Sequence, residues 1–182
     1  MTDLARIYGR SLYGLAGEEG LTEPIMEQMM QVRRIFRENS EYVPLLLEPS
    51  LSRREREDLL DKAFGREIQP YLLNFLKLLC GKNILGEYSA CCREYKRLYY
   101  QDNGIAEAKV TSASMPNEQQ KKALKDRLEK ISGKKIVLVW KKDSSVLAGL
   151  QVDIEGRRLD GTIKGRLELL SRELKGDGKE IP

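Results

Sequence analysis

The chain has 182 residues, enough for one or two small domains, with 32 Lys and Arg against 28 Asp and Glu. It contains no histidine, which excludes Ser-His and Cys-His catalytic pairs and zinc sites with histidine ligands. Its cysteines, Cys80, Cys91 and Cys92, lack C-x-x-C spacing, and we expect reduced thiols that pack as small apolar residues. These exclusions favour a protein that binds other molecules over an enzyme.

The composition changes near residue 105. Residues 1–105 hold 15 basic and 16 acidic side chains, whereas residues 106–182 hold 17 basic and 12 acidic ones. Eleven of the twelve aromatic residues lie at or before Tyr100, and only Trp140 follows. We therefore predict two domains, residues 1–104 and 105–174, followed by a disordered tail over 175–182.

Apolar residues at helical spacing predict six short helices in the first domain. Thr22 is the expected N-cap of the second helix, and Ser52 with Glu55 forms an expected capping box at the start of the fourth. Gly65 is the expected stop of that fourth helix. The six ranges are roughly 4–16, 22–38, 42–47, 52–64, 68–80 and 85–102.

In the second domain the hydrophobic period changes to that of strands, which are expected at 105–113, 136–140 and 150–154. Asn117 is the expected cap of a helix whose buried stripe is Leu124, Leu128 and Ile131. A closing helix is expected over 162–174. The predicted fold class is α+β overall, with an N-terminal six-helix bundle followed by a small C-terminal α/β domain.

The glycines and basic pairs of the second domain leave several interpretations open. The segment 156–162 has the glycine spacing of a phosphate-binding loop but lacks the lysine before Thr162. Pairs such as Lys121-Lys122 and Lys141-Lys142 are typical of solvated faces, and they also suit an acidic protein partner or a nucleic-acid backbone. A nucleic-acid-binding adaptor is the competing hypothesis. A small enzyme has little support, because no carboxylates are paired for acid/base catalysis.

The expected helices 4–16 and 68–80 are apolar over more than one face. Two such helices side by side would leave an apolar groove for a partner helix. A fully central position in the bundle explains the same pattern, and the sequence does not separate these alternatives.

An ordered set of motifs resembles the ATP synthase delta subunit family, which is related to the mitochondrial oligomycin-sensitivity-conferring protein. The resemblance spans about residues 4–174. The motifs are Ala5-Arg6-Ile7-Tyr8-Gly9-Arg10-Ser11-Leu12-Tyr13, Leu46-Leu47-Glu48-Pro49-Ser50-Leu51-Ser52, Leu72-Leu73-Asn74-Phe75-Leu76-Lys77, Leu147-Ala148-Gly149-Leu150 and Leu159-Asp160-Gly161-Thr162-Ile163-Lys164-Gly165-Arg166-Leu167.

The resemblance implies a non-catalytic peripheral-stalk, or stator, subunit of a rotary proton-translocating ATP synthase. Such a subunit links the catalytic head to the b subunits and resists rotation. The family's bundle holds the N-terminal helix of an alpha subunit in a groove between its first and fifth helices. The groove residues carried over are Leu4, Tyr8, Ser11, Leu12, Leu15, Tyr71, Asn74, Phe75 and Leu78.

The C-terminal domain is implied to meet the C-terminal ends of the b-subunit dimer. No cofactor, metal or nucleic acid is implied, and one copy per complex is expected. The start of the chain does not look like a transit peptide, so we expect a bacterial protein on the cytoplasmic face of the cell membrane, associated only through the complex. Signature residues with an implied structural role are Gly149, Asp160, Gly161, Gly165, Arg166 and Leu167.

Overall fold

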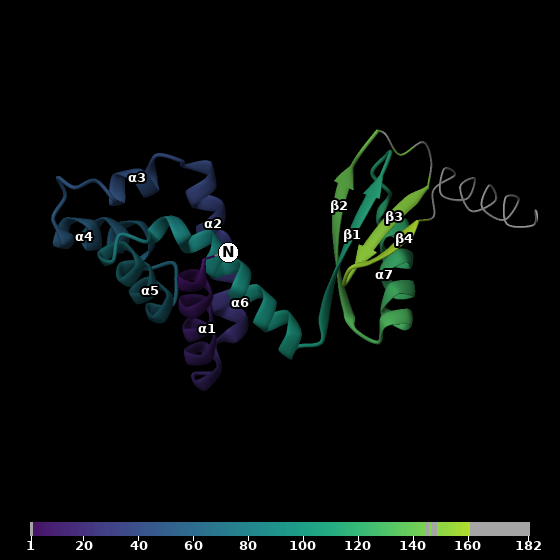
Figure 1. Ribbon diagram of the computed structural model, residues 1–182, viewed down its shortest axis with the longest axis horizontal. Helices are drawn as coiled ribbons and strands as arrows, with labels where there is room; N and C mark the ends of the chain where they lie inside the picture. Colours follow the sequence, from purple (N-terminus) through teal and green to yellow (C-terminus); the bar gives the residue numbers. More distant parts are fainter. Residues whose placement is uncertain (1, 145, 147–148, 161–182) are drawn as a thin grey trace, which may run out of the picture. The chain divides into compact units, whose positions relative to one another are not determined.

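The structure is a computed structural model that describes residues 2–144, 146 and 149–160 (Figure 1). The chain divides into two compact units, Met1–Asp102 and Asn103–Pro182. The first unit is helical, and the second is built on a small mixed sheet, so the predicted α+β class is confirmed. In the described part of the chain no helix is both long enough and apolar enough to cross a membrane.

The described residues contain seven α-helices, of which α7 belongs to the second unit, together with one 3-10 helix. Helix α1 packs mainly against α6 and also contacts α2 and α5, while α4 packs against α5. The elements of the first unit are α1 (Asp3–Glu18), α2 (Thr22–Glu38), α3 (Tyr42–Leu46), α4 (Arg53–Phe64), α5 (Pro70–Gly81), the 3-10 helix η1 (Leu85–Glu87) and α6 (Tyr88–Asp102).

Local signals at the helix ends account for most of these boundaries. The Ser52 side chain accepts a hydrogen bond from the Glu55 backbone N–H, and Glu55 accepts one from the Ser52 N–H, so the capping box is confirmed. Pro70 begins α5, because its fixed φ suits the first helical position and its missing N–H is not needed there. The expected N-cap at Thr22 is wrong. Helix α2 begins at Thr22 itself, since the preceding carbonyl, of Leu21, already accepts from the Ile25 N–H.

The core of the first unit lies where α2, α5 and α6 meet α1, and its buried polar groups are paired. The Tyr88 hydroxyl donates to the Met29 carbonyl at 3.2 Å, and the Tyr95 hydroxyl donates to the Thr22 carbonyl at 2.9 Å. The three cysteines are free and buried, as predicted. All three belong to the hydrophobic core of the first unit, where they pack as small apolar residues.

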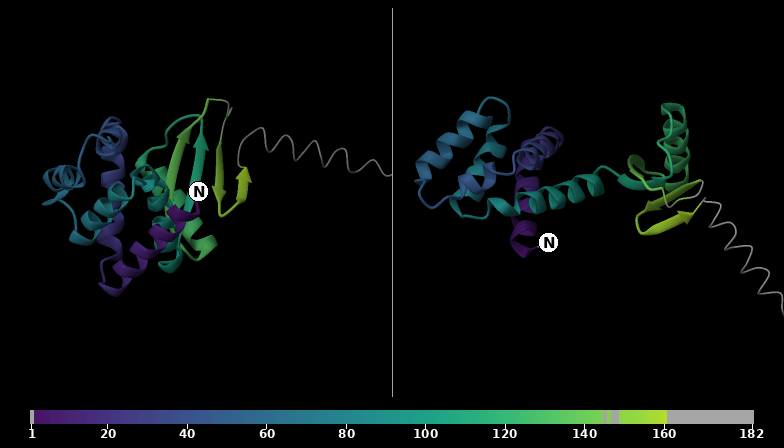
Figure 2. Two further views of the ribbon diagram at one scale, coloured as in Figure 1. Left: turned by 60° about the vertical axis from the view of Figure 1, so that its left-hand side comes forward. Right: turned by 90° about the horizontal axis from the view of Figure 1, so that it is seen from above.

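The second unit contains a four-stranded sheet in the order β2-β1-β3-β4. Strand β1 runs parallel to β2 and antiparallel to β3, and β3 pairs antiparallel with β4. Helix α7, whose side-chain cap by Asn117 is confirmed, connects β1 to β2 and lies on one face of the sheet (Figure 2). The elements are β1 (Ile105–Ser112), α7 (Glu118–Ser132), β2 (Lys135–Lys142), β3 (Leu150–Ile154) and β4 (Arg157–Asp160).

Strand β4 was not expected from the sequence. Glu155 and Gly156 both have positive φ, 50° and 78°, as in the tight two-residue turns that join antiparallel strands. This turn pairs the charged run after Gly156 with β3. A strand with consecutive arginines lacks the apolar alternation on which strand prediction depends.

The alternation expected in β1 is confirmed, with Ala106, Ala108 and Val110 buried beneath α7. The expected burial of Ile131 is wrong, because this side chain is 69% exposed. Helix α7 directs Leu128 at the sheet, and Ile131 lies about 60° round the helix from Leu128 at 3.6 residues per turn. The closing helix expected over 162–174 and the tail over 175–182 lie outside the described residues.

Candidate partner-binding groove

A hollow of about 530 Å³ lies between α1 and α5, the two helices whose apolar surfaces are too wide for burial on one side. Eight of the nine residues predicted for the groove line it. The lining residues are Ile7, Tyr8, Ser11, Leu12, Leu15, Tyr71, Asn74, Phe75 and Leu78.

Helical spacing explains how α1 packs into the core with one stripe of residues and lines the hollow with another. Ala5, Leu12 and Ala16 form a buried stripe, together with Gly9. The neighbouring stripe, which includes Ile7 and Leu15, is displaced round the helix and reaches the hollow. Because Ile7 is 60% exposed, α1 is not a fully central helix, and the open face is the one beside α5.

Two residues differ from the sequence prediction of the groove. Leu4, which was predicted to line it, is half-exposed one turn before the hollow and does not line it. Ile7 was missed, although its spacing of four residues to Ser11 and eight to Leu15 places the three on one helical face. The groove residues were carried over from the family resemblance, and that set contained Leu4 and not Ile7.

The polar groups of the groove are few, and two of them are engaged within the chain. The Ser11 hydroxyl donates to the Ile7 carbonyl at 2.9 Å, one turn back along α1. A hydrogen bond from the Tyr71 hydroxyl to the Glu19 carboxylate raises the pKa of Tyr71, because the bond favours the protonated phenol. The groove thus offers chiefly apolar contact, with a carboxylate beside Tyr71.

Helix α1, which forms one wall of the groove, is held in position by close packing against α6. Gly9 lies against the carbonyl of Cys91, at a point where the two helices approach too closely for a side chain. Tyr13 stacks edge-on against Tyr95, with ring centroids 5.1 Å apart, and its hydroxyl donates to Asp102 at 2.8 Å. Burial, followed by that hydrogen bond, raises the pKa of Tyr13 to about 12.

A buried carboxylate lies beside the same crossing. Glu94 is 1% exposed and accepts two hydrogen bonds from the Arg97 guanidinium, at 2.8 and 2.9 Å. Arg10 of α1 approaches the same carboxylate at 3.9 Å. The Arg97 hydrogen bonds outweigh the desolvation of the carboxylate and lower the pKa of Glu94. The sequence prediction missed Glu94, because a glutamate among basic neighbours on a helix is usually exposed.

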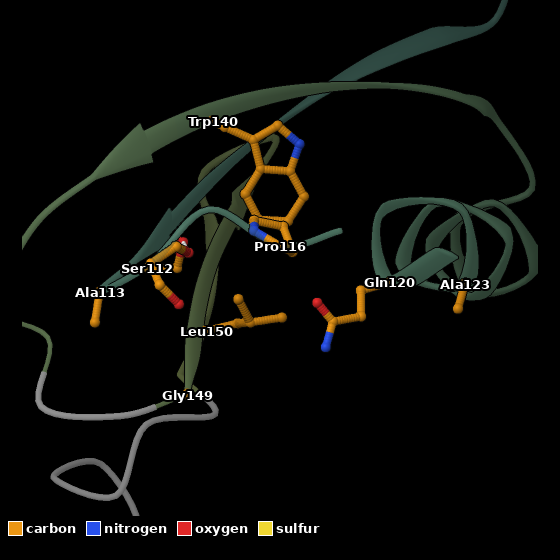
Figure 3. Close-up of a pocket in the computed structure, with 9 residues that line it drawn as sticks. Ser112, Ala113, Pro116, Gln120, Ala123, Trp140, Gly149 and Leu150 are labelled. Atoms are coloured by element: carbon orange, nitrogen blue, oxygen red, sulfur yellow. Dashed lines mark hydrogen bonds between the residues drawn. The ribbon is translucent and has the colours of Figure 1, made fainter. Parts of the chain in front are cut away.

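A second hollow, of about 620 Å³, lies in the second unit between α7 and the end of the sheet where β1 stops (Figure 3). We call it the sheet-face hollow; its lining residues are Ser112, Ala113, Ser114, Pro116, Gln120, Ala123, Trp140, Gly149 and Leu150.

The structure describes two of the signature residues. Gly149 has a φ of 97° immediately before β3, a conformation that glycine adopts without strain. Of the other signature residues, Asp160 ends β4, and Gly161, Gly165, Arg166 and Leu167 lie outside the described residues. Within the described ranges no cluster of three or more potential metal ligands occurs.

Comparison with known proteins gives consistent matches over nearly the whole chain. The model of the ATP synthase delta (OSCP) subunit family matches residues 4–174. ATP synthase subunit delta of Halalkalibacterium halodurans is 31% identical over 172 residues, which cover 94% of this chain and 94% of that protein. The sodium ion specific delta subunit of Ilyobacter tartaricus is 28% identical over 165 residues, or 91% and 94% of the two chains.

Among solved structures, a chain of the mitochondrial ATP synthase hexamer of Toxoplasma gondii superposes with a TM-score of 0.72. The match covers 96% of this chain and 98% of that chain at 20% identity, so it is a likeness of fold.

Proposed function

Because the chain belongs to the ATP synthase delta (OSCP) subunit family, we propose that its helical unit, α1 to α6, acts as a six-helix bundle that holds the N-terminal helix of an alpha subunit in the α1–α5 groove. Members of the family are the peripheral-stalk component of F-type ATP synthase, a structural part and not the catalytic subunit. The chain is therefore a non-catalytic stalk subunit in the machinery of ATP synthesis and ion transport.

The observation that carries the groove assignment is the exposure of large apolar side chains along both walls. Ile7 of α1 is 60% exposed and Leu78 of α5 is 44% exposed, and both line the same hollow. Exposed apolar surface of this kind, flanked by polar residues, marks binding sites for other proteins. An amphipathic helix that inserts an apolar stripe between α1 and α5 would cover both side chains.

The stalk role sets what this groove must do mechanically. A stator holds the catalytic head against the torque of the rotating shaft, so its contacts must persist under load. Apolar burial along two rigid helices suits this task, because its strength depends on area and not on the orientation of single hydrogen bonds.

We propose that the second unit, Asn103–Pro182, meets the C-terminal ends of the b subunits and that the complex sits on the cytoplasmic face of a bacterial membrane.

The groove is tested by the affinity of the full-length chain for a synthetic alpha N-terminal peptide, measured by calorimetry. Ile7→Asp and Leu78→Asp should each weaken binding roughly ten- to hundredfold, because fully burying an isoleucine or leucine is worth about 1.5–3 kcal/mol and 1.4 kcal/mol is a factor of ten. Both residues are exposed, so the variants should fold normally. Leu45→Asp is the matched control: Leu45 is 47% exposed, but it lies on α3.

Leu4→Asp adds a second comparison on α1 itself. Leu4 is 50% exposed but does not line the hollow, so its substitution should weaken binding much less than Ile7→Asp. Equal affinity for the wild-type chain, Ile7→Asp and Leu78→Asp would refute the groove assignment.

A further inference from the structure

The two walls of the α1–α5 groove run in opposite directions. Tyr71, in the first turn of α5, donates a hydrogen bond to the carboxylate of Glu19, which is the C-cap of α1. The start of α5 therefore lies beside the end of α1. It follows that Leu15 and Tyr71 lie toward one end of the groove, whereas Ile7 and Leu78 lie toward the other.

Each wall ends in a charged residue that continues its groove-lining stripe. On α1, Glu19 follows Leu15 by four residues, and on α5, Lys82 follows Leu78 by the same interval. This spacing places each charged residue on the groove side of its helix. Both are exposed C-cap residues, and Glu18 adds a second negative charge next to Glu19. Because the walls are antiparallel, the carboxylates and the ammonium group lie at opposite ends of the groove.

Neighbouring charges do not cancel this polarity. Tyr71 binds Glu19 as a neutral phenol, so the negative charge of the carboxylate remains. At the other end of the groove, the carboxylate of Asp3 is paired with Arg6 at 3.6 Å. The dipoles of α1 and α5 oppose each other at both ends, because the two helices are antiparallel. The polarity of the groove therefore depends on Glu19 and Lys82.

A helix that enters the groove carries a dipole of its own. Its N-terminus bears about half a positive charge and its C-terminus about half a negative one. Tyr71 and Lys82 are eleven residues apart on α5, a rise of about 16 Å, so three turns of partner helix reach from one charged end to the other. Opposite charges meet at both ends of the groove in only one of the two possible directions.

We propose that Glu19 and Lys82 set the direction of the bound helix, with its N-terminal end at Glu19 and its C-terminal end at Lys82. The helix then runs antiparallel to α1, and the rest of its chain leaves the groove beside Lys82. This inference rests on the proposed function, which supplies the N-terminal helix of an alpha subunit as the occupant. Apolar contact is non-directional, so it provides affinity, and the two charges provide the direction.

Photo-cross-linking of a synthetic alpha N-terminal peptide to the full-length chain reads the direction. One peptide carries benzophenone in its first helical turn, and a second peptide carries it in its last turn. We expect the first to label residues 15–20 or 70–72 and the second to label residues 4–8 or 78–83, as mapped by mass spectrometry. The reversed pattern, or labelling of both ends by each peptide, would overturn the proposal. Absence of binding by either peptide would instead refute the proposed function, and this inference with it.

Calorimetry with an acetylated and amidated peptide tests the two charges. Glu19→Gln retains an acceptor for Tyr71, and it and Lys82→Gln should each weaken binding roughly two- to fivefold at low salt, the effect of one charge at a helix end. The loss should vanish at about 1 M salt, where charges are screened within about 3 Å. Glu67→Gln and Lys62→Gln, exposed residues that line a different hollow, are the matched controls and should bind like the wild type. Wild-type affinity of both groove variants at low salt would overturn the proposal.

Discussion

The approach of α1 to α6 at Gly9 makes a sharp prediction, because a single methyl group tests it. A Cβ added at Gly9 lies 2.8 Å from the Cys91 carbonyl oxygen and 3.0 Å from the Glu94 Cβ. Carbon atoms in proteins do not approach a backbone oxygen this closely, so in Gly9→Ala one of the two helices must move. The obstructing atom belongs to the backbone of α6 and cannot rotate away.

The magnitude follows from two opposing effects. Forcing an extra methyl group into a closely packed contact costs about 1–3 kcal/mol. Alanine is favoured over glycine in a helix interior by about 1 kcal/mol at most, which offsets part of that cost. We expect Gly9→Ala to lower the free energy of unfolding by about 1–2 kcal/mol.

Gly14 provides the control within the same helix. It is exposed in α1, and a Cβ added there meets nothing within 4 Å. Gly14→Ala should therefore raise the free energy of unfolding by about 0.5–1 kcal/mol, through helix propensity alone. Urea denaturation followed by circular dichroism measures both changes. If the two variants shift the unfolding midpoint in the same direction, the account of the α1–α6 crossing is wrong.

Three further predictions concern capping, charge and thiol reactivity. Ser52→Ala removes the cap of α4 and should lower the free energy of unfolding by about 1 kcal/mol in the same assay, whereas Ser50→Ala, in the preceding turn, should change it by less than about 0.5 kcal/mol. The pKa of Glu94 in the folded state is lower than its ordinary value of 4.5. The ionised carboxylate therefore stabilises the folded protein at pH values above 4.5. This stabilisation is lost as the pH falls through the folded-state pKa of Glu94. Glu94→Gln should therefore be less stable than wild type at pH 7, and the difference should shrink as the pH of the urea titration falls below 4.5; a difference independent of pH would contradict the assignment. Burial raises the pKa of Cys80, that of Cys91 to about 11 and that of Cys92 to about 12, so none of the three thiols should react with Ellman's reagent at pH 8 until the protein is unfolded. Rapid labelling of the native chain would show that the core of the helical unit is open.

The helices were largely predictable from sequence, because their signals are local. The capping box at Ser52 and the cap at Asn117 are complete within four residues, and both are present. The caps depend on local patterns that a single sequence displays directly. For the two widely apolar helices, periodicity left a groove and a central position open, and the family resemblance supplied the groove residues.

The features that the sequence did not predict depend on contacts between distant parts of the chain. Strand β4 is held by pairing with β3 and has no apolar alternation of its own. Glu94 is buried where α1 crosses α6 and Arg10 of α1 approaches it, whereas the residue type predicts exposure. Ile131 has the spacing of a core residue, but the rotation of α7 on the sheet leaves it exposed. Helix rotation and strand pairing are set by packing, which periodicity does not encode.

Cross-linking in the assembled synthase tests whether the α1–α5 groove is the surface that holds the catalytic head. A photoreactive residue is placed at Leu78, in the groove, or at Leu45, on α3, two positions of similar exposure. We expect that after illumination the residue at position 78 gives a cross-link to the N-terminal segment of alpha and that the residue at position 45 does not. A cross-link to that segment from Leu45, with none from Leu78, would contradict it.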